Sequence, residues 1–217
     1  TREHFFDLYF SKVNPSDFFF VQIGANDGKS ADPIHSYISK YNLSGIVVEP
    51  LADAFMRLQD TYQDNKRITF VNVAIGATSG VMTLYMVKEF AKTEKNWFKM
   101  TGISSFNKTV IKKTLVKKIP PMADTEDYIQ ELPIKTLSLN DLVKQYDIKK
   151  IDMLQIDCEG YDYEIIKTLD FSRFHPNLIN FESDHFSNKD REECENLLTS
   201  KGYKFFRYGD DTCAYKC

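Results

Sequence analysis

Short β-forming runs alternate with amphipathic stretches along most of this chain, and this alternation limits the folds that it can adopt. Strands joined by crossover helices form a mostly parallel sheet with helices on both faces. Near the C-terminus, two β-like runs are joined by residues 209–211, which predicts a hairpin and hence one antiparallel strand. We therefore expect an α/β fold. The predicted strands are 18–23, 45–48, 68–74, 151–156, 178–182, 203–208 and 212–216.

Helical periodicity follows several of these strands. Asp32 and Pro33 are expected to supply the N-cap and the first-turn proline of one helix. Apolar residues at helical spacing predict further helices over 51–62 and 161–169 and a last one through 193–198.

The size and composition of the chain suit one domain, 1–217. Apolar residues make up 42% of its 217 residues and charged residues 27%, which excludes collagen-like and wholly disordered chains. The longest apolar stretch, 18–23, is too short to span a membrane, so we expect no membrane partner. The four cysteines form no Cys-x-x-Cys pair, which favours free thiols and a cytoplasmic location over a Cys213–Cys217 disulfide.

Lysine is concentrated in one stretch. Residues 88–118 contain nine lysines and two glutamates, whereas the net charge of the whole chain is −3. We interpret 88–134 as an excursion from the sheet, and either a solvated face or a lid that recognises an acidic or phosphorylated acceptor explains its charge. Trp97, Phe98 and Phe106 could stack on a sugar ring or pack the excursion onto the sheet. The overall charge gives no reason to expect nucleic acid as a partner.

A glycine turn follows the first predicted strand. Gly24 and Gly28 are separated by three residues, and a ligand commonly binds at this place in a doubly wound sheet. We expect glycine here because a β-carbon would hold the backbone away from a bound molecule. A plain tight turn is the alternative. The dinucleotide pattern Gly-x-Gly-x-x-Gly is absent, which disfavours a nicotinamide cofactor.

A carboxylate at the end of the second predicted strand strengthens the case for a ligand. Glu49, followed by Pro50, stands where an acidic side chain accepts hydrogen bonds from both hydroxyls of a ribose. A carboxylate at the start of a helix is the alternative for Glu49 alone. Asn72, Val73 and Ala74 end the next strand, where an adenine ring would lie.

Two carboxylates one residue apart end a later strand. Asp157 and Glu159 could bind an amine, accept a proton or coordinate a divalent ion, although acids near a helix start are also favoured by the helix dipole. Glu182 and His185 follow the next strand and are predicted to face the same cleft, with an incidental loop histidine as the alternative.

These motifs together resemble the methyltransferase domain of the FkbM family, a group within the Rossmann-like, S-adenosylmethionine-dependent methyltransferases. The resemblance extends from about 18 to 185, and the block 157–160 with the helix after it is its most specific part. Gln22 departs from the pattern, because methyltransferases often carry Asp or Glu there to hold the methionine ammonium. The stretches that carry the resemblance are 20–28, 47–50, 72–76, 101–106, 135–142 and 151–166.

The resemblance implies a class I methyltransferase fold, with a seven-stranded, mostly parallel sheet, one antiparallel C-terminal strand and helices on both faces. It also implies transfer of a methyl group from S-adenosylmethionine to a hydroxyl of a sugar, glycan or natural product. Asp157, Glu159 or His185 would accept the hydroxyl proton, and Ser104 and Ser105 would lie near the acceptor. The cofactor-binding residues would be Gln22, Gly24, Asn26, Asp27, Gly28, Glu49, Pro50, Asn72, Val73, Ala74 and Asp157.

Three alternatives remain open at this point. A divalent metal could assist the transfer, with Glu182 as a third ligand beside the Asp157 and Glu159 pair. The chain could retain the fold only for binding, as the loss of the acid at Gln22 would suggest. A nucleotide-dependent oxidoreductase is the least favoured reading, because the third glycine of the dinucleotide pattern is absent.

Overall fold

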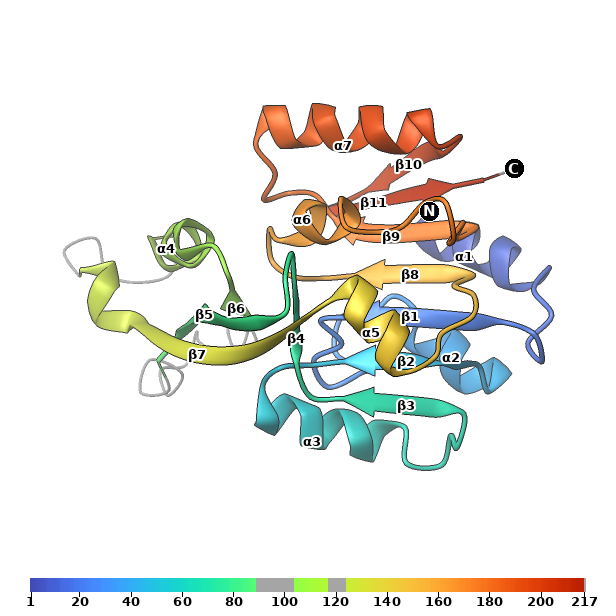
Figure 1. The fold of residues 1–217 in the computed structure, drawn as a ribbon, viewed down its shortest axis with the longest axis horizontal. Coiled ribbons are helices and arrows are strands. Elements are labelled where there is room, and N and C mark those ends of the chain that lie inside the picture. Colours follow the sequence, from blue (N-terminus) through green and yellow to red (C-terminus); the bar gives the residue numbers. More distant parts are fainter. Residues whose placement is uncertain (89–103, 117–123, 217) are drawn as a thin grey trace.

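The large sheet has seven strands in the order β10-β11-β9-β8-β1-β2-β3 (Figure 1). The computed structural model describes residues 1–88, 104–116 and 124–216. Strand β11 is antiparallel to both of its neighbours, and every other neighbouring pair in this sheet is parallel. The predicted mostly parallel sheet and its single reversed strand are confirmed. Its strands are β1 Phe19–Ile23, β2 Ser44–Val48, β3 Ile68–Val71, β8 Met153–Ile156, β9 Leu178–Glu182, β10 Lys204–Tyr208 and β11 Asp211–Tyr215.

Helices cover both faces of this sheet because successive side chains of a strand point to opposite sides. In β1, Val21 and Ile23 belong to one buried cluster, together with residues of α5, α6 and α7. Phe20 belongs to the other cluster, with residues of α1, α2 and α3. The helices are α1 Arg2–Phe10, α2 His35–Tyr41, α3 Ala52–Thr61, α5 Leu139–Gln145, α6 Asp162–Ile166 and α7 Asn188–Ser200.

A second, four-stranded sheet of order β4-β7-β5-β6 extends from the edge at which the parallel strands end (Figure 1). Val87, Ile111, Leu115 and Ile129 form its own small buried cluster. The elements of this region are β4 Ala74–Gly76, β5 Gly80–Val87, β6 Ser104–Ser105, α4 Lys108–Val116, η2 Thr125–Tyr128 and β7 Ile129–Ser138.

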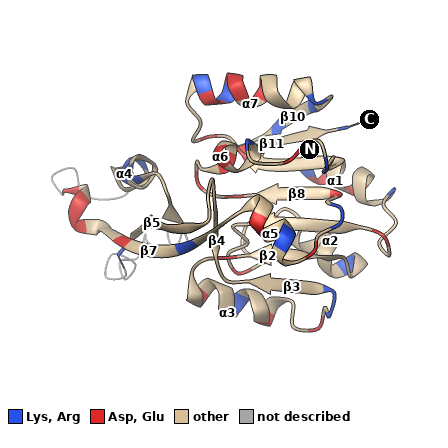
Figure 2. Ribbon diagram, viewed as in Figure 1, with Lys and Arg blue, Asp and Glu red and all other residues tan. Residues whose placement is uncertain are grey.

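Helix α4 carries basic residues, and the neighbouring η2 and β7 carry acidic ones (Figure 2). Lys108 forms ion pairs with Glu126 of η2 and Glu131 of β7, each 2.9 Å long, and Lys112 pairs with Glu126. These lysines of the predicted basic excursion are therefore partnered within the chain. Trp97 and Phe98 lie outside the described residues.

The structure corrects three local predictions. The run predicted as one strand over 68–74 is split, since β3 ends at Val71 and Ala74 begins β4 in the other sheet. Helix α2 begins later than predicted: Asp32 accepts the Ile34 and His35 N–H groups from the loop and does not serve as the N-cap. Helix α4 lies within 88–118, where the residue pattern indicated no regular element.

No helix among the described residues is long and apolar enough to cross a bilayer. Cys158, Cys194 and Cys213 are free thiols, and Cys213 donates to Asn180 Oδ1 at 2.7 Å. Cys217, its partner in the disulfide considered above, lies outside the described residues.

Candidate active site

Three neighbouring strands end at the same level and bring three predicted site residues together. Ile23 of β1 is in register with Val48 of β2 and with Ile156 of β8. The next residues along the chain are therefore adjacent. A cavity opens above them, and Gly24, Glu49 and Asp157 all line it.

The cavity has a second wall, formed by the small sheet and the connections to it. Among its residues, Ser105 donates a hydrogen bond to the backbone carbonyl of Glu159 at 2.7 Å, which joins the two walls. Phe106 packs edge-on against Tyr161, with ring centroids 5.0 Å apart, so its ring is engaged with the loop after β8. This wall consists of Val73, Ala74, Ile75, Leu84, Ser104, Ser105 and Phe106.

Glu49 is fixed by the backbone around it. Its Oε2 accepts the Asn26 N–H and its Oε1 accepts the Leu51 N–H, each at 2.9 Å. Burial raises the pKa of this carboxyl, and the two N–H donors act in the opposite direction. A carboxylate has about four acceptor sites, so two of them remain for a ligand.

The glycines of the turn are required for a reason other than the one predicted. A β-carbon on Gly24 would lie 1.8 Å from the Asp157 carbonyl oxygen, and one on Gly28 would lie 2.6 Å from Leu58 and 2.7 Å from Tyr62. Both residues have positive φ, of 77° and 71°. The glycines therefore allow close packing of the protein on itself, and Gly28 does not line the cavity.

Asp157 faces the cavity and is exposed there. Enclosure by the surrounding protein, followed by the charges of Asp162 and Glu159, raises its pKa well above the ordinary value. This carboxyl therefore binds a proton readily, and a cation bound beside it would favour its ionised form.

Asp162 is a buried carboxyl that the sequence analysis did not identify. It accepts the Cys158 N–H at 3.3 Å and the Glu182 N–H at 3.1 Å, so it ties the loop after β8 to the end of β9. Burial raises its pKa to about 7. Its place just after Glu159 and Gly160 was a usable signal, because buried acids at helix starts often accept backbone N–H groups.

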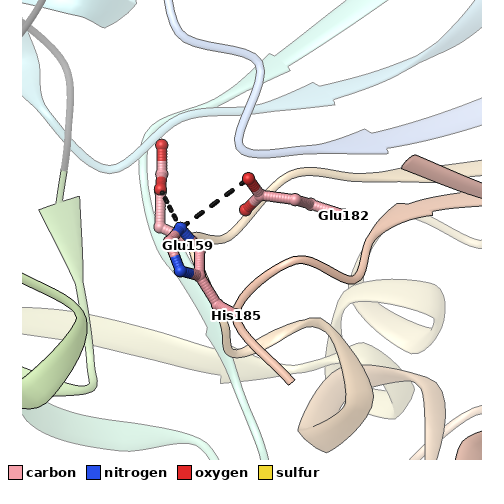
Figure 3. A group of neighbouring side chains, drawn as sticks. All are labelled: Glu159, Glu182 and His185. Carbon is pink, nitrogen blue, oxygen red and sulfur yellow. Dashed lines mark hydrogen bonds and ion pairs between the residues drawn. The ribbon is translucent and has the colours of Figure 1, made fainter. Parts of the chain in front are cut away.

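Glu159, Glu182 and His185 converge at the side of the cavity (Figure 3). The His185 Nε2 lies 3.2 Å from Glu159 Oε2 and 3.7 Å from Glu182 Oε1. The hydrogen bond to Glu159 raises the pKa of His185. Burial and the charges of Glu159 and Asp157 raise the pKa of Glu182 to about 10. Of these three residues, only Glu159 lines the cavity.

Several predicted cofactor residues lie off the cavity wall. Gln22 points to the α2 side, where its Nε2 donates to Asp32 at 3.0 Å. Asn72 donates to the Glu49 and Pro50 carbonyls. Asp27 accepts the Lys29 and Ser30 N–H groups, so it shapes the turn. The predicted cofactor residues that line the cavity are Gly24, Asn26, Glu49, Pro50, Val73, Ala74 and Asp157.

Ile75, Leu84 and Cys158 also line the cavity, and the sequence analysis did not identify them. The β-forming composition of 80–87 was the signal for Leu84, whereas nothing in the local sequence indicates that Leu84 lies beside the carboxyl edge of the large sheet.

The strand order, the single reversed strand and the cavity at the carboxyl edge define the fold of class I methyltransferases. Residues 22–205 match the family model for the methyltransferase FkbM domain, and the chain belongs to this family.

Two solved structures share the fold. Methyltransferase FkbM from Methylobacillus flagellatus KT aligns with a TM-score of 0.54 and 17% identity, over 91% of this chain and 42% of that protein. The methyltransferase domain of METTL16 aligns with a TM-score of 0.50 and 10% identity, over 98% of this chain and 65% of that one. Among curated proteins, no sequence match was found.

Proposed function

We propose that this chain transfers a methyl group from S-adenosylmethionine to a hydroxyl of a small-molecule or glycan acceptor, such as a sugar or a natural product. The observation that carries the proposal is the pair of carboxylates, Glu49 and Asp157, that line one cavity at the ends of neighbouring parallel strands. Ligands of such sheets bind at the carboxyl ends of the strands.

The donor set of the cavity fits this cofactor. Glu49 retains two acceptor sites for the hydroxyls of a ribose. Apolar side chains of Val73, Ile75 and Leu84 can cover an aromatic ring. Asp157 supplies a carboxylate for the cationic, methionine-derived part of the cofactor. In this way Asp157 would take over the contact with the methionine ammonium that an acid at the position of Gln22 makes in many methyltransferases.

The residues of the chain would act by alignment and by proton transfer. When bound, the cofactor supplies an electrophilic methyl group on a positively charged sulfur. Asp157 would accept the proton of the attacking hydroxyl, because its carboxylate lines the cavity at the end of β8. Ser104, Ser105 and Phe106 would hold the acceptor over the methyl group, so the distance of attack is set between the two walls. The excursion 88–134 would supply the rest of the acceptor site.

Glu49 offers a direct test of the cofactor site. We expect Glu49→Ala to weaken the binding of S-adenosylhomocysteine by about 1.5–3 kcal/mol, because hydrogen bonds to a charged group are lost. Isothermal titration calorimetry measures the change, and Glu49→Gln, which keeps the side-chain length, should show a smaller loss. Glu192→Ala is the matched control, because Glu192 is exposed on α7. Equal affinities for wild type and Glu49→Ala would remove Glu49 from the site.

Thermal unfolding with a panel of nucleotides tests the class of cofactor. A ligand at 100 times its dissociation constant stabilises a protein by about 2.7 kcal/mol, which gives a rise of roughly 5–10 °C for a chain of this size. We expect this rise with S-adenosylmethionine and S-adenosylhomocysteine. A rise with NAD(H) or NADP(H) alone would instead support an oxidoreductase, and no rise with any of them would support a protein that keeps the fold for binding.

A further inference from the structure

Glu159, Glu182 and His185 form a compact group with ligand atoms suited to a metal ion. They come from the loop after β8, the end of β9 and the turn that follows β9, and their side chains point toward one another (Figure 3). One potential ligand atom from each residue lies within 4.8 Å of the other two. Asp157, which the alternative of metal assistance would pair with Glu159, is not a member of this group.

The group sets two carboxyl groups against a single imidazole nitrogen. Within the described residues, the ion pairs of Glu159 and Glu182 are both to the same nitrogen of His185. The distance to Glu182 Oε1, 3.7 Å, is too long for a hydrogen bond. The other oxygen, Glu182 Oε2, is buried and has no hydrogen-bond partner in the described part of the chain.

An unpartnered buried carboxylate oxygen is costly, and it indicates that a group absent from the polypeptide completes the site. A cation satisfies both carboxylates at once, which a single imidazole N–H cannot do. The side chains of Glu182 and His185 are 16% and 20% exposed, so a small ion can reach them while most bulk water is kept out.

We propose that Glu159, Glu182 and His185 bind a divalent transition-metal ion. Two carboxylate oxygens and one imidazole nitrogen suit Mn²⁺ or Zn²⁺, whereas Mg²⁺ and Ca²⁺ favour sets made of oxygen alone. Three protein ligands leave coordination positions for water or for another oxygen.

The position of the group suggests what the ion does. Glu159 lines the cavity as well as contacting His185, so the ion would lie at the side of the cavity, next to the wall that carries Asp157. An acceptor hydroxyl that entered an open coordination position would lose its proton more easily. This role depends on the proposed function, whereas binding of the ion does not.

Direct binding of Mn²⁺ tests the site without cofactor or acceptor. Full-length chain, treated with a chelator and dialysed, is titrated with Mn²⁺, and the free ion is followed by its electron paramagnetic resonance signal. We expect one strongly bound ion per chain. Glu182→Gln and His185→Gln should each weaken binding roughly tenfold or more, since loss of an outer partner of a ligand already costs that much.

Two matched variants control for nonspecific binding by acidic surfaces. Glu192→Gln and His175→Gln change the same residue types at exposed positions outside the group, and they should bind Mn²⁺ as the wild type does. Far-ultraviolet circular dichroism checks that each variant is folded. Failure of the wild type to bind Mn²⁺ or Zn²⁺ at millimolar concentration, or unchanged binding by folded Glu182→Gln, overturns the proposal.

Cofactor binding separates this inference from the proposed function. Glu182→Gln should retain its affinity for S-adenosylhomocysteine while it loses Mn²⁺. If the wild type binds Mn²⁺ but no adenosyl ligand, the metal site stands and the methyltransferase proposal fails. If the wild type binds the adenosyl ligand and no metal, the metal site fails and the methyltransferase proposal stands.

Discussion

The two sheets of this protein differ in how deeply their strands are buried. Each face of the large sheet is covered by three helices, and its central strands β1, β2, β8 and β9 are buried over almost their whole length. The small sheet relies on the long antiparallel pair β5 and β7 and on a cluster of four buried residues. The cavity lies between them. We expect from this comparison that the large sheet holds the proposed reactive groups rigidly and that the small sheet adapts to the proposed acceptor.

The largest difference between the two regions should appear in the kinetic effects of substitutions in the two cavity walls. We expect Asp157→Asn to lower kcat by roughly 10²- to 10⁴-fold, the usual contribution of a general base, and to raise the KM for S-adenosylmethionine, because the residue is also proposed to hold the methionine-derived part. Phe106→Ala, in the other wall, should mainly raise the KM for the acceptor. Formation of S-adenosylhomocysteine with a panel of sugar and natural-product hydroxyls measures both. An active Asp157→Asn variant would remove the residue from the role of base.

Packing gives the next largest difference. Leu154 of β8 and Leu115 of α4 are both fully buried, one in each region. Leu154→Ala should lower the free energy of unfolding by about 3–5 kcal/mol and Leu115→Ala by about 2–3 kcal/mol, because the smaller cluster can collapse onto the gap. Urea unfolding measures both changes. Hydrogen exchange should show that Leu115→Ala loosens only the small sheet, and equal global losses would contradict the distinction.

Two glycines with positive φ test backbone packing in each region. Gly24→Ala should cost several kcal/mol, because its β-carbon would meet the Asp157 carbonyl at 1.8 Å. Gly80, at the start of β5, has φ 151° and open space around it, so Gly80→Ala should cost only about 1 kcal/mol for the backbone conformation. Thermal unfolding distinguishes them. Similar losses would show that conformation, and not the close approach, governs Gly24.

Substitution of two aspartates, Asp32 and Asp141, should change the pH dependence of stability in opposite directions, with smaller effects than the substitutions above. Burial raises the pKa of Asp32, so folding disfavours its charged form. The protein then loses stability as the pH rises through the ordinary Asp range. Asp32→Asn should therefore be the more stable protein at pH 7, and its advantage should vanish well below pH 4. The asparagine introduced by this substitution can still pair with Gln22, because rotation of the Gln22 amide by 180° presents its oxygen as an acceptor.

Asp141, which joins α5 to the turn before β5, provides the comparison. Hydrogen bonds from Ser79 and Ser138 lower its pKa, so its contribution to stability is present above the ordinary Asp range and is lost as the pH falls. Asp141→Asn should therefore be less stable than the wild type at pH 7 and equal to it at low pH. Urea unfolding between pH 3 and pH 8 measures both variants, and a common sign would contradict the assignment.

Local sequence patterns were sufficient for the large sheet and insufficient for the small one. The strands that end at Ile23, Val48 and Ile156 are short, β-rich and followed by turns, so both their existence and the residues after them could be predicted. The small sheet instead depends on pairing of β5 with β7 across a long intervening stretch. No local property of either segment determines that pairing.

The residues of the candidate site also fall into those that local sequence could predict and those that it could not. Glu49 and Asp157 could be located because each directly follows a strand. The side chain of Gln22 points to the α2 side of β1, next to Asp32. This orientation could not be predicted, because the local sequence does not tell which face of β1 α2 covers. The approach of Glu182 to His185 and Glu159 required the register between β8 and β9.

The close approach at Gly24 has a consequence for protein engineering. The turn after β1 and the loop after β8 are joined by backbone contact, since the Asp157 N–H also donates to the Ile23 carbonyl at 2.9 Å. A library that randomises either loop will therefore consist mostly of misfolded proteins. Diversity placed at Leu84 of β5 and at Phe106, directly after β6, changes the other wall of the cavity while this junction stays intact. A new acceptor preference is best selected there.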